Sequence, residues 1–360
     1  MKHIGIDVRL LFQTGVGTYL QNLIHYIPLF CPPDVDFTFY CLPSDVAFIQ
    51  KEVPQCRIHI TTALWHSWNE QVEFLNCINA DNLDLMHFTY FGHPVMYNRK
   101  YISTIHDITP LLFKTGKAST KNPLIYQSKH AAFSFILKNQ VERSAAIITP
   151  TNTVKEQLTS LYGERIGRKV SPIYEGVSYR ILSSEGGENT IARPYLLYVG
   201  NFYPHKNVEF LIKTFTKSNL PYVLVLAGPH DFFLKRILNS LSEEEKKYIL
   251  VKDKQSLPEL VALYQHAEAL IHPSISEGFG LPIVEAMYFG IPIIASHIPV
   301  FQELLGASYY SFDPFEEASL QQATQTFEGM QKKKVATMRN EFSFHEMVKK
   351  TVAIYLTHVK

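Results

Sequence analysis

Short apolar runs alternate with longer stretches in which apolar residues recur at helical spacing. In the first half of the chain, the runs at residues 3–6, 37–41, 85–87, 101–105 and 146–149 predict strands. The spacing of apolar residues predicts helices over 18–27, 123–144 and 153–162. The second half repeats the pattern, with predicted strands at 195–199, 222–227, 269–272 and 293–295 and predicted helices at 207–216, 257–266 and 282–289.

Alternation of strands and helices is typical of parallel sheets that are covered by helices on both faces. Residues 183–190 are polar, contain glycine and have no apolar periodicity, so they are the one stretch that we interpret as a linker. The fold class predicted is therefore α/β, with two doubly wound Rossmann-like domains over 1–186 and 187–342. A final helix is expected over 343–359. Ligands of such sheets bind at the carboxyl ends of the strands.

Composition describes an ordinary globular protein with a large core. The chain has 360 residues, of which 46% are hydrophobic and 19% charged. Its formal net charge is only +1, which argues against a nucleic acid as partner.

The four cysteines indicate a reducing compartment. Cys31, Cys41, Cys56 and Cys77 form no CxxC pair and have no spacing typical of metal ligands. The N-terminus enters a strand without the apolar core of a signal peptide, and no uncharged apolar run reaches the ~20 residues of a membrane span. A cytoplasmic location is therefore expected.

The segment with the most chemical information reads Ser-Glu-Gly-Phe-Gly-Leu-Pro-Ile-Val-Glu over residues 276–285. It follows a predicted buried strand, and Pro282 stands where a helix can begin. A glycine turn before a helix presents free backbone N–H groups, which bind anions. Glu277 lies on the turn and Glu285 about one turn into the helix. A phosphate at the turn, with hydroxyls held by carboxylates on both sides, is what a nucleotide-sugar site requires.

This motif resembles that of the family 4 retaining glycosyltransferases, which have the GT-B fold. Further segments resemble the same family in the same order: residues 4–17 its first strand and glycine loop, 104–107 its acceptor-side histidine segment, and 198–207 its phosphate-contacting segment. Together they span nearly the whole chain. The resemblance implies two Rossmann-like domains that face each other across a cleft, and a C-terminal helix, 343–360, that returns to the first domain.

The resemblance also implies roles for residues of the second domain. Glu285 would bind the ribose hydroxyls of the donor, and Glu277 the hydroxyls of the transferred sugar. Lys206 would neutralise the departing diphosphate, where negative charge accumulates. The family usually has an arginine beside this lysine, whereas this chain has His205, which carries full charge only below pH ~6.5. The remaining donor-binding candidates are Gly200, Asn201, Gly278, Phe279, Gly280 and Leu281, although the Phe279 side chain is expected to pack rather than to bind.

In the first domain, Gly15 and Gly17 would bring backbone amides near the donor phosphates. His106 would lie near the transferred sugar and the acceptor, as a catalytic residue together with Glu277 and Lys206. Asp107 either orients His106 or caps the following turn. Asp7 and Arg9 are interpreted as a structural pair.

These features predict a retaining hexosyltransferase that moves a sugar from a nucleoside diphosphate to a glycan or lipid-linked acceptor. Residues 203–207 resemble those of bacterial polysaccharide mannosyltransferases and favour mannose from GDP-mannose, with a UDP-glucose-type donor or a non-catalytic nucleotide-sugar-binding protein as alternatives. No cofactor is expected. The one Asp-x-Asp sequence, Asp34 to Asp36, is interpreted as a turn, so the chemistry is expected to be metal-independent.

Residues 113–143 carry an excess of basic side chains: Lys114, Lys117, Lys121, Lys129, Lys138 and Arg143 against Glu142. Two interpretations remain open. The segment is either an ordinary helix with solvated lysines or a basic surface, joined by Trp65 and Trp68, that contacts anionic lipid on the inner face of the cytoplasmic membrane.

Overall fold

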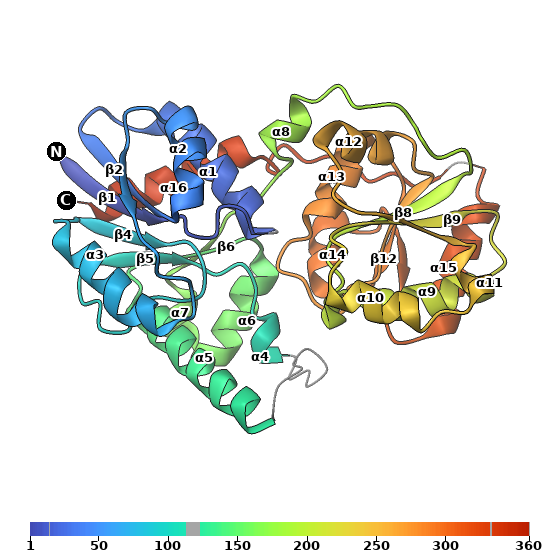
Figure 1. Ribbon diagram of the computed structural model, residues 1–360, viewed down its shortest axis with the longest axis horizontal. Coiled ribbons are helices and arrows are strands. Elements are labelled where there is room, and N and C mark those ends of the chain that lie inside the picture. The colour runs from blue at the N-terminus through green and yellow to red at the C-terminus, as the bar shows by residue number, and fades with distance from the viewer. Residues whose placement is uncertain (14, 113–122, 332, 360) are drawn as a thin grey trace. The chain divides into compact units, whose positions relative to one another are not determined.

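The computed structural model describes residues 1–13, 15–112, 123–331 and 333–359. These residues form two compact units, each with its own sheet and its own helices (Figure 1). Of the described residues, the first unit contains those up to 112, those from 123 to Glu175, and the C-terminal segment from Ser343. The second contains Gly176–Phe342, so the predicted linker at 183–190 belongs to the second unit.

The first unit is built on a seven-stranded sheet in the order β3-β2-β1-β4-β5-β6-β7. Its neighbouring strands pair in parallel. The strands are β1 (Lys2–Asp7), β2 (Val35–Cys41), β3 (Arg57–Ile60), β4 (Leu85–Phe88), β5 (Tyr101–Thr104), β6 (Ile147–Thr149) and β7 (Val170–Pro172).

The helices of the first unit include one that comes from the far end of the chain. They are α1 (Val16–Phe30), α2 (Val46–Glu52), α3 (Leu75–Ala80), α4 (Thr109–Leu112), α5 (Pro123–Arg143), α6 (Asn152–Tyr162), α7 (Glu164–Gly167) and α16 (Phe344–His358). A 3-10 turn, η1 (Pro43–Asp45), and a π-helical turn, η2 (Glu70–Phe74), complete the set. Helix α16 packs against α1. Its Tyr355 hydroxyl lies 2.7 Å from Nδ1 of His87 on β4, which ties the helix to the sheet.

The second unit is built on a six-stranded parallel sheet in the order β10-β9-β8-β11-β12-β13. The strands are β8 (Tyr195–Val199), β9 (Val223–Ala227), β10 (Ile249–Lys252), β11 (Ala269–His272), β12 (Ile293–Ser296) and β13 (Tyr310–Phe312). The helices are α8 (Tyr179–Leu182), α9 (Val208–Lys217), α10 (Phe232–Asn239), α11 (Glu243–Lys246), α12 (Leu257–Gln265), α13 (Leu281–Phe289), α14 (Pro299–Leu305) and α15 (Glu317–Gly329), with a 3-10 turn η4 (Pro204–Lys206).

Apolar faces of three helices make the main core of the second unit. Leu211 and Phe215 of α9, Leu234 of α10 and Phe327 of α15 pack with the strands in one buried cluster. Burial of a large apolar side chain stabilises a fold by about 1.5–3 kcal/mol. Because so many wholly buried residues line the central strands, these strands are held firmly and their carboxyl ends are rigid supports for the loops that follow.

The predicted α/β fold class is confirmed. The differences from the sequence expectations lie at element ends, at sheet edges and in helices without a predicted counterpart, which include α2, α3, α10, α14 and α15. Strand β2 begins at Val35 rather than at 37, so Asp36 belongs to the strand and not to the predicted turn. Strands β3, β7, β10 and β13 had no predicted counterpart, and each of them is an edge of its sheet. Edge strands are partly exposed, so they lack the continuous apolar run of a buried strand.

Candidate functional site

Each sheet has one point where the chain order of the strands reverses. In the first unit it lies between β1 and β4, and in the second between β8 and β11. Loops after strands at such a point leave in opposite directions and open a crevice for ligands at the carboxyl ends. The predicted site residues follow these strands or the ones beside them, and they form two groups, one in each unit.

In the second unit, an ion pair joins the loops after the two switch-point strands. Lys206, in η4 after β8, places its Nζ 2.7 Å and 2.8 Å from the two carboxylate oxygens of Glu277, which follows β11. The side chains are 16% and 9% exposed, so the pair is largely shielded from water. A charge pair in this setting interacts far more strongly than one at the surface. The structure thus brings together two of the three predicted catalytic residues.

Two further side chains hold the Glu277 carboxylate. The Ser274 hydroxyl donates to Oε1 at 2.6 Å, and Nε2 of His272 lies 3.0 Å from the same oxygen. Burial by itself raises the pKa of Glu277. The charge of Lys206 and the hydrogen bonds from His272 and Lys206 outweigh burial, so the pKa lies well below its usual range. Glu277 is therefore ionised at neutral pH.

His272 is a site residue that the sequence reasoning missed. It is 1% exposed, stacks on Tyr198 and meets Phe301 edge-on. Burial lowers its pKa, so the ring is neutral and its hydrogen lies on Nε2, facing the carboxylate. The sequence signal was available, because His272 is a polar residue at the carboxyl end of an otherwise apolar strand.

Backbone contacts fix the two loops relative to each other. The Ile275 amide donates to the carbonyl of His205 at 2.8 Å, one residue before Lys206. Gly200 follows β8, and its carbonyl oxygen lies only 1.9 Å from the point that a Cβ on Gly228 would occupy. Gly228 thus permits the end of β9 to approach the β8 loop, and it too was missed. The Tyr198 hydroxyl donates a hydrogen bond to the backbone carbonyl of Asn201 at 2.5 Å.

The glycine turn leads into α13 through a backbone conformation that favours glycine. Gly280 caps the helix with a φ of 96°, a conformation that side chains disfavour, and a Cβ there would lie 2.9 Å from the Phe301 ring. Phe279 is buried and packs edge-on against Phe342, as predicted for its side chain. What Gly278, Phe279 and Leu281 offer a ligand is therefore backbone at a helix N-terminus.

Glu285 is separate from the Lys206–Glu277 pair and has a different environment. Its side chain is inside the unit, with the residue 7% exposed, and its Oε2 accepts the Tyr264 hydroxyl at 2.5 Å. Burial raises its pKa to about 7, against the opposing effect of the Tyr264 hydrogen bond. Two glutamates eight positions apart thus have pKa values displaced in opposite directions, which is typical of functional sites.

In the first unit, His106 is held by protein groups at both ring nitrogens. Nε2 lies 3.0 Å from the Thr89 carbonyl, and Nδ1 lies 3.1 Å from the Glu175 carboxylate. Both partners offer oxygen atoms, so the ring is held between a backbone carbonyl and a carboxylate. Tyr19 of α1 meets the His106 ring edge-on at 4.7 Å. His106 is thereby connected to the helix that Gly15 precedes.

The other predicted residues of this unit have structural contacts. Asp107 accepts the Thr109 amide at 2.7 Å and so caps the turn that starts α4. Arg9 binds both carboxylate oxygens of Asp7 and also Glu70, which extends the expected pair to a buried triad. Gly17 lies in the first turn of α1, and its amide donates to the Gln13 carbonyl of the preceding loop at 2.8 Å.

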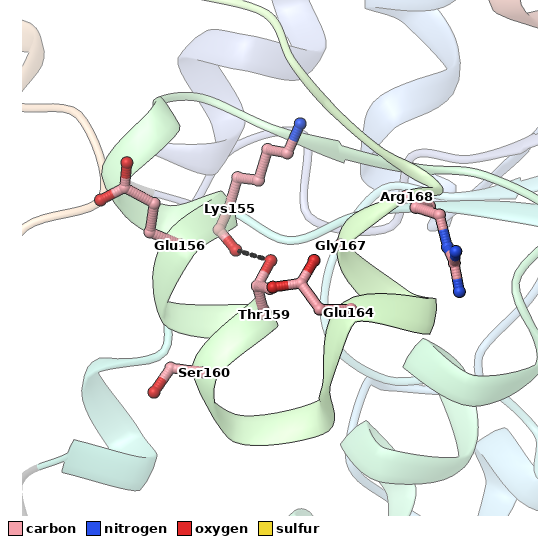
Figure 2. Close-up of a pocket in the computed structure, with 7 residues that line it drawn as sticks. All are labelled: Lys155, Glu156, Thr159, Ser160, Glu164, Gly167 and Arg168. Atoms are coloured by element: carbon pink, nitrogen blue, oxygen red, sulfur yellow. Dashed lines mark hydrogen bonds between the residues drawn. The ribbon is translucent and has the colours of Figure 1, made fainter.

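A pocket on α6 and α7 lies apart from the predicted residues. Figure 2 shows its lining side chains, whose charged ends point in different directions, and the hydrogen bond of 2.8 Å from the Thr159 hydroxyl to the Lys155 carbonyl. The lining residues are Lys155, Glu156, Thr159, Ser160, Glu164, Gly167 and Arg168. None of them is a predicted site residue, and their charges do not converge on a common point.

Part of the basic segment 113–143 lies outside the described residues, which begin again at 123. Within the described part, Arg143 donates to the carbonyls of Val95 and Tyr97 and so has a structural role. Phe135 and Trp68 are exposed, at 62% and 86%. Across the residues that the structure describes, no helix is both long enough and apolar enough to cross a membrane. Within the same residues, no group of three or more potential metal ligands is found.

The fold and the two switch-point sites define a GT-B protein, and comparisons with known proteins agree. Residues 187–341 match the family model described as Glycosyl transferases group 1. The O-antigen chain mannosyltransferase RfbU of Salmonella typhimurium is 30% identical over 267 residues, covering 74% of this chain and 70% of that protein. An O-antigen chain mannosyltransferase B of Escherichia coli is 24% identical, covering 71% and 69%.

Sucrose-phosphate synthase from Thermosynechococcus elongatus has the same fold, with a TM-score of 0.79 at 16% identity over 99% of both chains. The chain therefore belongs to the group 1 glycosyltransferase family and is a glycosyltransferase. The family resemblance inferred from residues 4–17, 104–107, 198–207 and 276–285 is confirmed. The individual roles of the site residues stay predictions.

Proposed function

We propose that this glycosyltransferase transfers mannose from GDP-mannose to a hydroxyl of a glycan or lipid-linked acceptor, with retention of the anomeric configuration. The observation that carries the proposal is the shielded Lys206–Glu277 pair at the β8/β11 switch point, with Glu285 one turn into α13. The choice of mannose is supported by relatives that are named mannosyltransferases.

The geometry suits a donor whose diphosphate lies at the N-terminus of α13. There the backbone N–H groups and the helix dipole favour a negative charge. The Lys206 ammonium has three N–H donors, and two of them are directed at the two carboxylate oxygens of Glu277. A donor remains for the diphosphate, so Lys206 would stabilise the charge that develops as the sugar–phosphate bond breaks. Glu277, fixed by His272 and Ser274, would accept hydroxyls of the transferred sugar.

The proposed transfer needs no covalent intermediate. The bond between the anomeric carbon and the phosphate oxygen breaks, and the acceptor oxygen forms its bond on the same face of the sugar. The acceptor proton passes to the leaving phosphate oxygen. In the first unit, Gly15, Gly17 and His106 are proposed to contact donor phosphate or acceptor, and Glu175 to fix the His106 ring.

We propose that the reaction is metal-independent and that the basic segment gives the enzyme a peripheral contact with anionic membrane. The first proposal is supported by Asp36, the second carboxylate of the Asp-x-Asp sequence, which pairs with Arg57 at 3.1 Å. The second is supported by exposed Phe135 beside Lys138 on α5. Exposed aromatic and basic side chains together favour a lipid interface.

The donor is tested by thermal unfolding of the full chain with GDP, UDP and ADP at equal concentration. A ligand that binds only the folded state raises stability by RT ln(1 + [L]/Kd), so GDP is expected to raise Tm most. A synthetic acceptor, octyl α-mannopyranoside, is then incubated with GDP-mannose in excess EDTA. We expect GDP release only when acceptor is present and an α-linked product by NMR.

Protection by UDP alone would replace GDP-mannose with a UDP-glucose-type donor. A solved relative in fold, HepE of Anabaena, is described in complex with UDP and glucose, at 14% identity and a TM-score of 0.72 over 99% and 100% of the two chains. Activity that needs added manganese or magnesium would overturn the metal-independent mechanism. A β-linked product would overturn retention, because the mannose of GDP-mannose is α-linked.

A further inference from the structure

A buried tyrosine donates a hydrogen bond to the carboxylate of Glu285, the proposed ribose-binding residue. Tyr264, on α12, is wholly buried, and its hydroxyl donates to Oε2 of Glu285 at 2.5 Å. A hydrogen bond to an ionised oxygen is shorter and about twice as strong as one between neutral groups. It also leaves the second carboxylate oxygen, Oε1, for another donor. The tyrosine therefore fixes the carboxylate without using all of its acceptor capacity.

The ring of Tyr264 is itself fixed by the helix that carries Glu285. Phe289 lies four residues after Glu285 on α13, so both side chains project from the same face of the helix. The Phe289 ring stacks on Tyr264 at 5.2 Å with an interplanar angle of 11°. One helix thus holds both ends of the tyrosine: Phe289 the ring and Glu285 the hydroxyl.

We propose that Tyr264 is a positioning residue for donor binding, which holds Glu285 in the orientation that presents its free oxygen to the ribose hydroxyls of a nucleoside diphosphate. This proposal rests on the proposed ribose-binding role of Glu285. Tyr264 itself touches the carboxylate and not the donor. Its contribution is to restrict the rotamers of a buried glutamate that would otherwise be ordered only when the donor binds.

The electrostatics of the pair give the proposal a pH dependence. Glu285 has a pKa of about 7, raised by burial and opposed by the hydrogen bond from Tyr264. Helix α13 packs against α12, which supplies Tyr264, and against β11, whose His272 faces Glu277 instead. Removal of the tyrosine hydroxyl removes the interaction that favours the ionised form. The pKa of Glu285 is then expected to rise further, so more of the protein has a protonated Glu285 at neutral pH.

The test is calorimetric titration of the full chain with GDP between pH 6 and 9, for the parent and for Tyr264→Phe. At pH 7 we expect Kd to rise by about tenfold, as for loss of a hydrogen bond to a charged group. The affinity of the variant should rise at higher pH, because the pH midpoint of its GDP binding is displaced upward, but it should stay below that of the parent, because the positioning contact is still absent. In steady-state kinetics the donor KM should rise more than kcat falls.

The matched control is Tyr195→Phe. Tyr195 is also buried, and its hydroxyl donates to the Leu263 carbonyl of α12 at 2.8 Å, so this variant removes a buried tyrosine hydrogen bond to the same helix without touching Glu285. This control variant should leave the Kd for GDP and its pH dependence unchanged. A Tyr195→Phe effect equal to that of Tyr264→Phe would reduce Tyr264 to a structural residue.

A second comparison separates this inference from the proposed function. Glu285→Gln is titrated alone and together with Tyr264→Phe. If Tyr264 acts through Glu285, the double variant binds GDP no more weakly than Glu285→Gln. A normal affinity in Glu285→Gln would reject the ribose-binding role itself. A weakened Glu285→Gln with a normal Tyr264→Phe would reject the positioning role alone.

Discussion

At the scale of single residues, the site depends on how Glu277 is kept ionised inside the protein. The sequence identified Glu277 and Lys206 as site candidates, because each stands in a recognisable motif after a strand. It did not indicate that they bind each other, since 71 positions separate them. It also missed His272 and Tyr264, which have no motif and whose roles depend on neighbours from other elements.

Substitution of Lys206 by methionine separates its two roles. Loss of the ammonium should lower kcat by ~100- to 1000-fold, the usual effect of removing one well-placed electrostatic stabiliser. The donor KM should rise less. Steady-state kinetics measure both, and Lys213→Met, which removes an exposed lysine paired with Glu209, is the matched control. A normal kcat in Lys206→Met would remove this lysine from the mechanism.

The same variant should lose stability in a pH-dependent way. Because the folded pKa of Glu277 lies below its value in the unfolded chain, its ionisation stabilises the parent above pH ~4.3, and this contribution falls as the pH falls. Lys206→Met should therefore unfold at lower urea concentration than the parent at pH 7, with a smaller difference at acid pH. An equal difference at both pH values would contradict the ion-pair explanation.

At the scale of elements, the ends of the strands determine the site. The hydrophobic pattern located the central strands, because burial on both faces requires an apolar run. The pattern missed β3, β7, β10 and β13, which are the sheet edges and which carry polar residues such as Arg57 and Ser311. These omissions do not affect the predicted site, because the switch points lie at β1/β4 and β8/β11, away from the sheet edges.

The close approach of β9 and the β8 loop leads to a prediction for Gly228. A Cβ at this position would lie 1.9 Å from the Gly200 carbonyl oxygen, and backbone cannot move aside as a side-chain end can. Gly228→Ala should therefore destabilise the fold by about 1–3 kcal/mol, the usual cost of overpacking. Urea unfolding measures this loss. Gly329→Ala is the control, because nothing lies within 4 Å of its Cβ position and stability should be unchanged or slightly higher.

At the scale of the whole molecule, the chain returns from its second unit to complete the first. Helix α16 packs against α1, and its Tyr355 pairs with His87 on β4. His87 is wholly buried, and burial lowers its pKa to about 3, so it is neutral in the folded protein. A second buried histidine of the first unit, His93, has a pKa lowered to about 4, again mainly by burial.

These histidines should make the protein sensitive to acid. Between pH ~6.5 and the folded pKa, the unfolded chain binds protons that the folded chain does not, so stability is full above pH ~6.5 and falls below it. Each histidine contributes a slope of up to ~1.4 kcal/mol per pH unit. His87→Gln should flatten the fall in unfolding free energy between pH 6 and 4. A slope that is unchanged in this variant would show that His87 does not govern the acid response.

The sequence by itself determined the class of protein and the positions of the chemistry. Apolar runs and glycine turns are local, so the strands of the sheet interior, the helix after Gly280 and the motif from Glu277 to Glu285 could be recognised from neighbouring residues alone. Tertiary structure decided which of these groups meet. The Lys206–Glu277 pair, the Tyr264–Glu285 contact and the approach of Gly228 to Gly200 join residues from different strands and helices. Their geometry and their ionisation follow from burial, which no local pattern specifies.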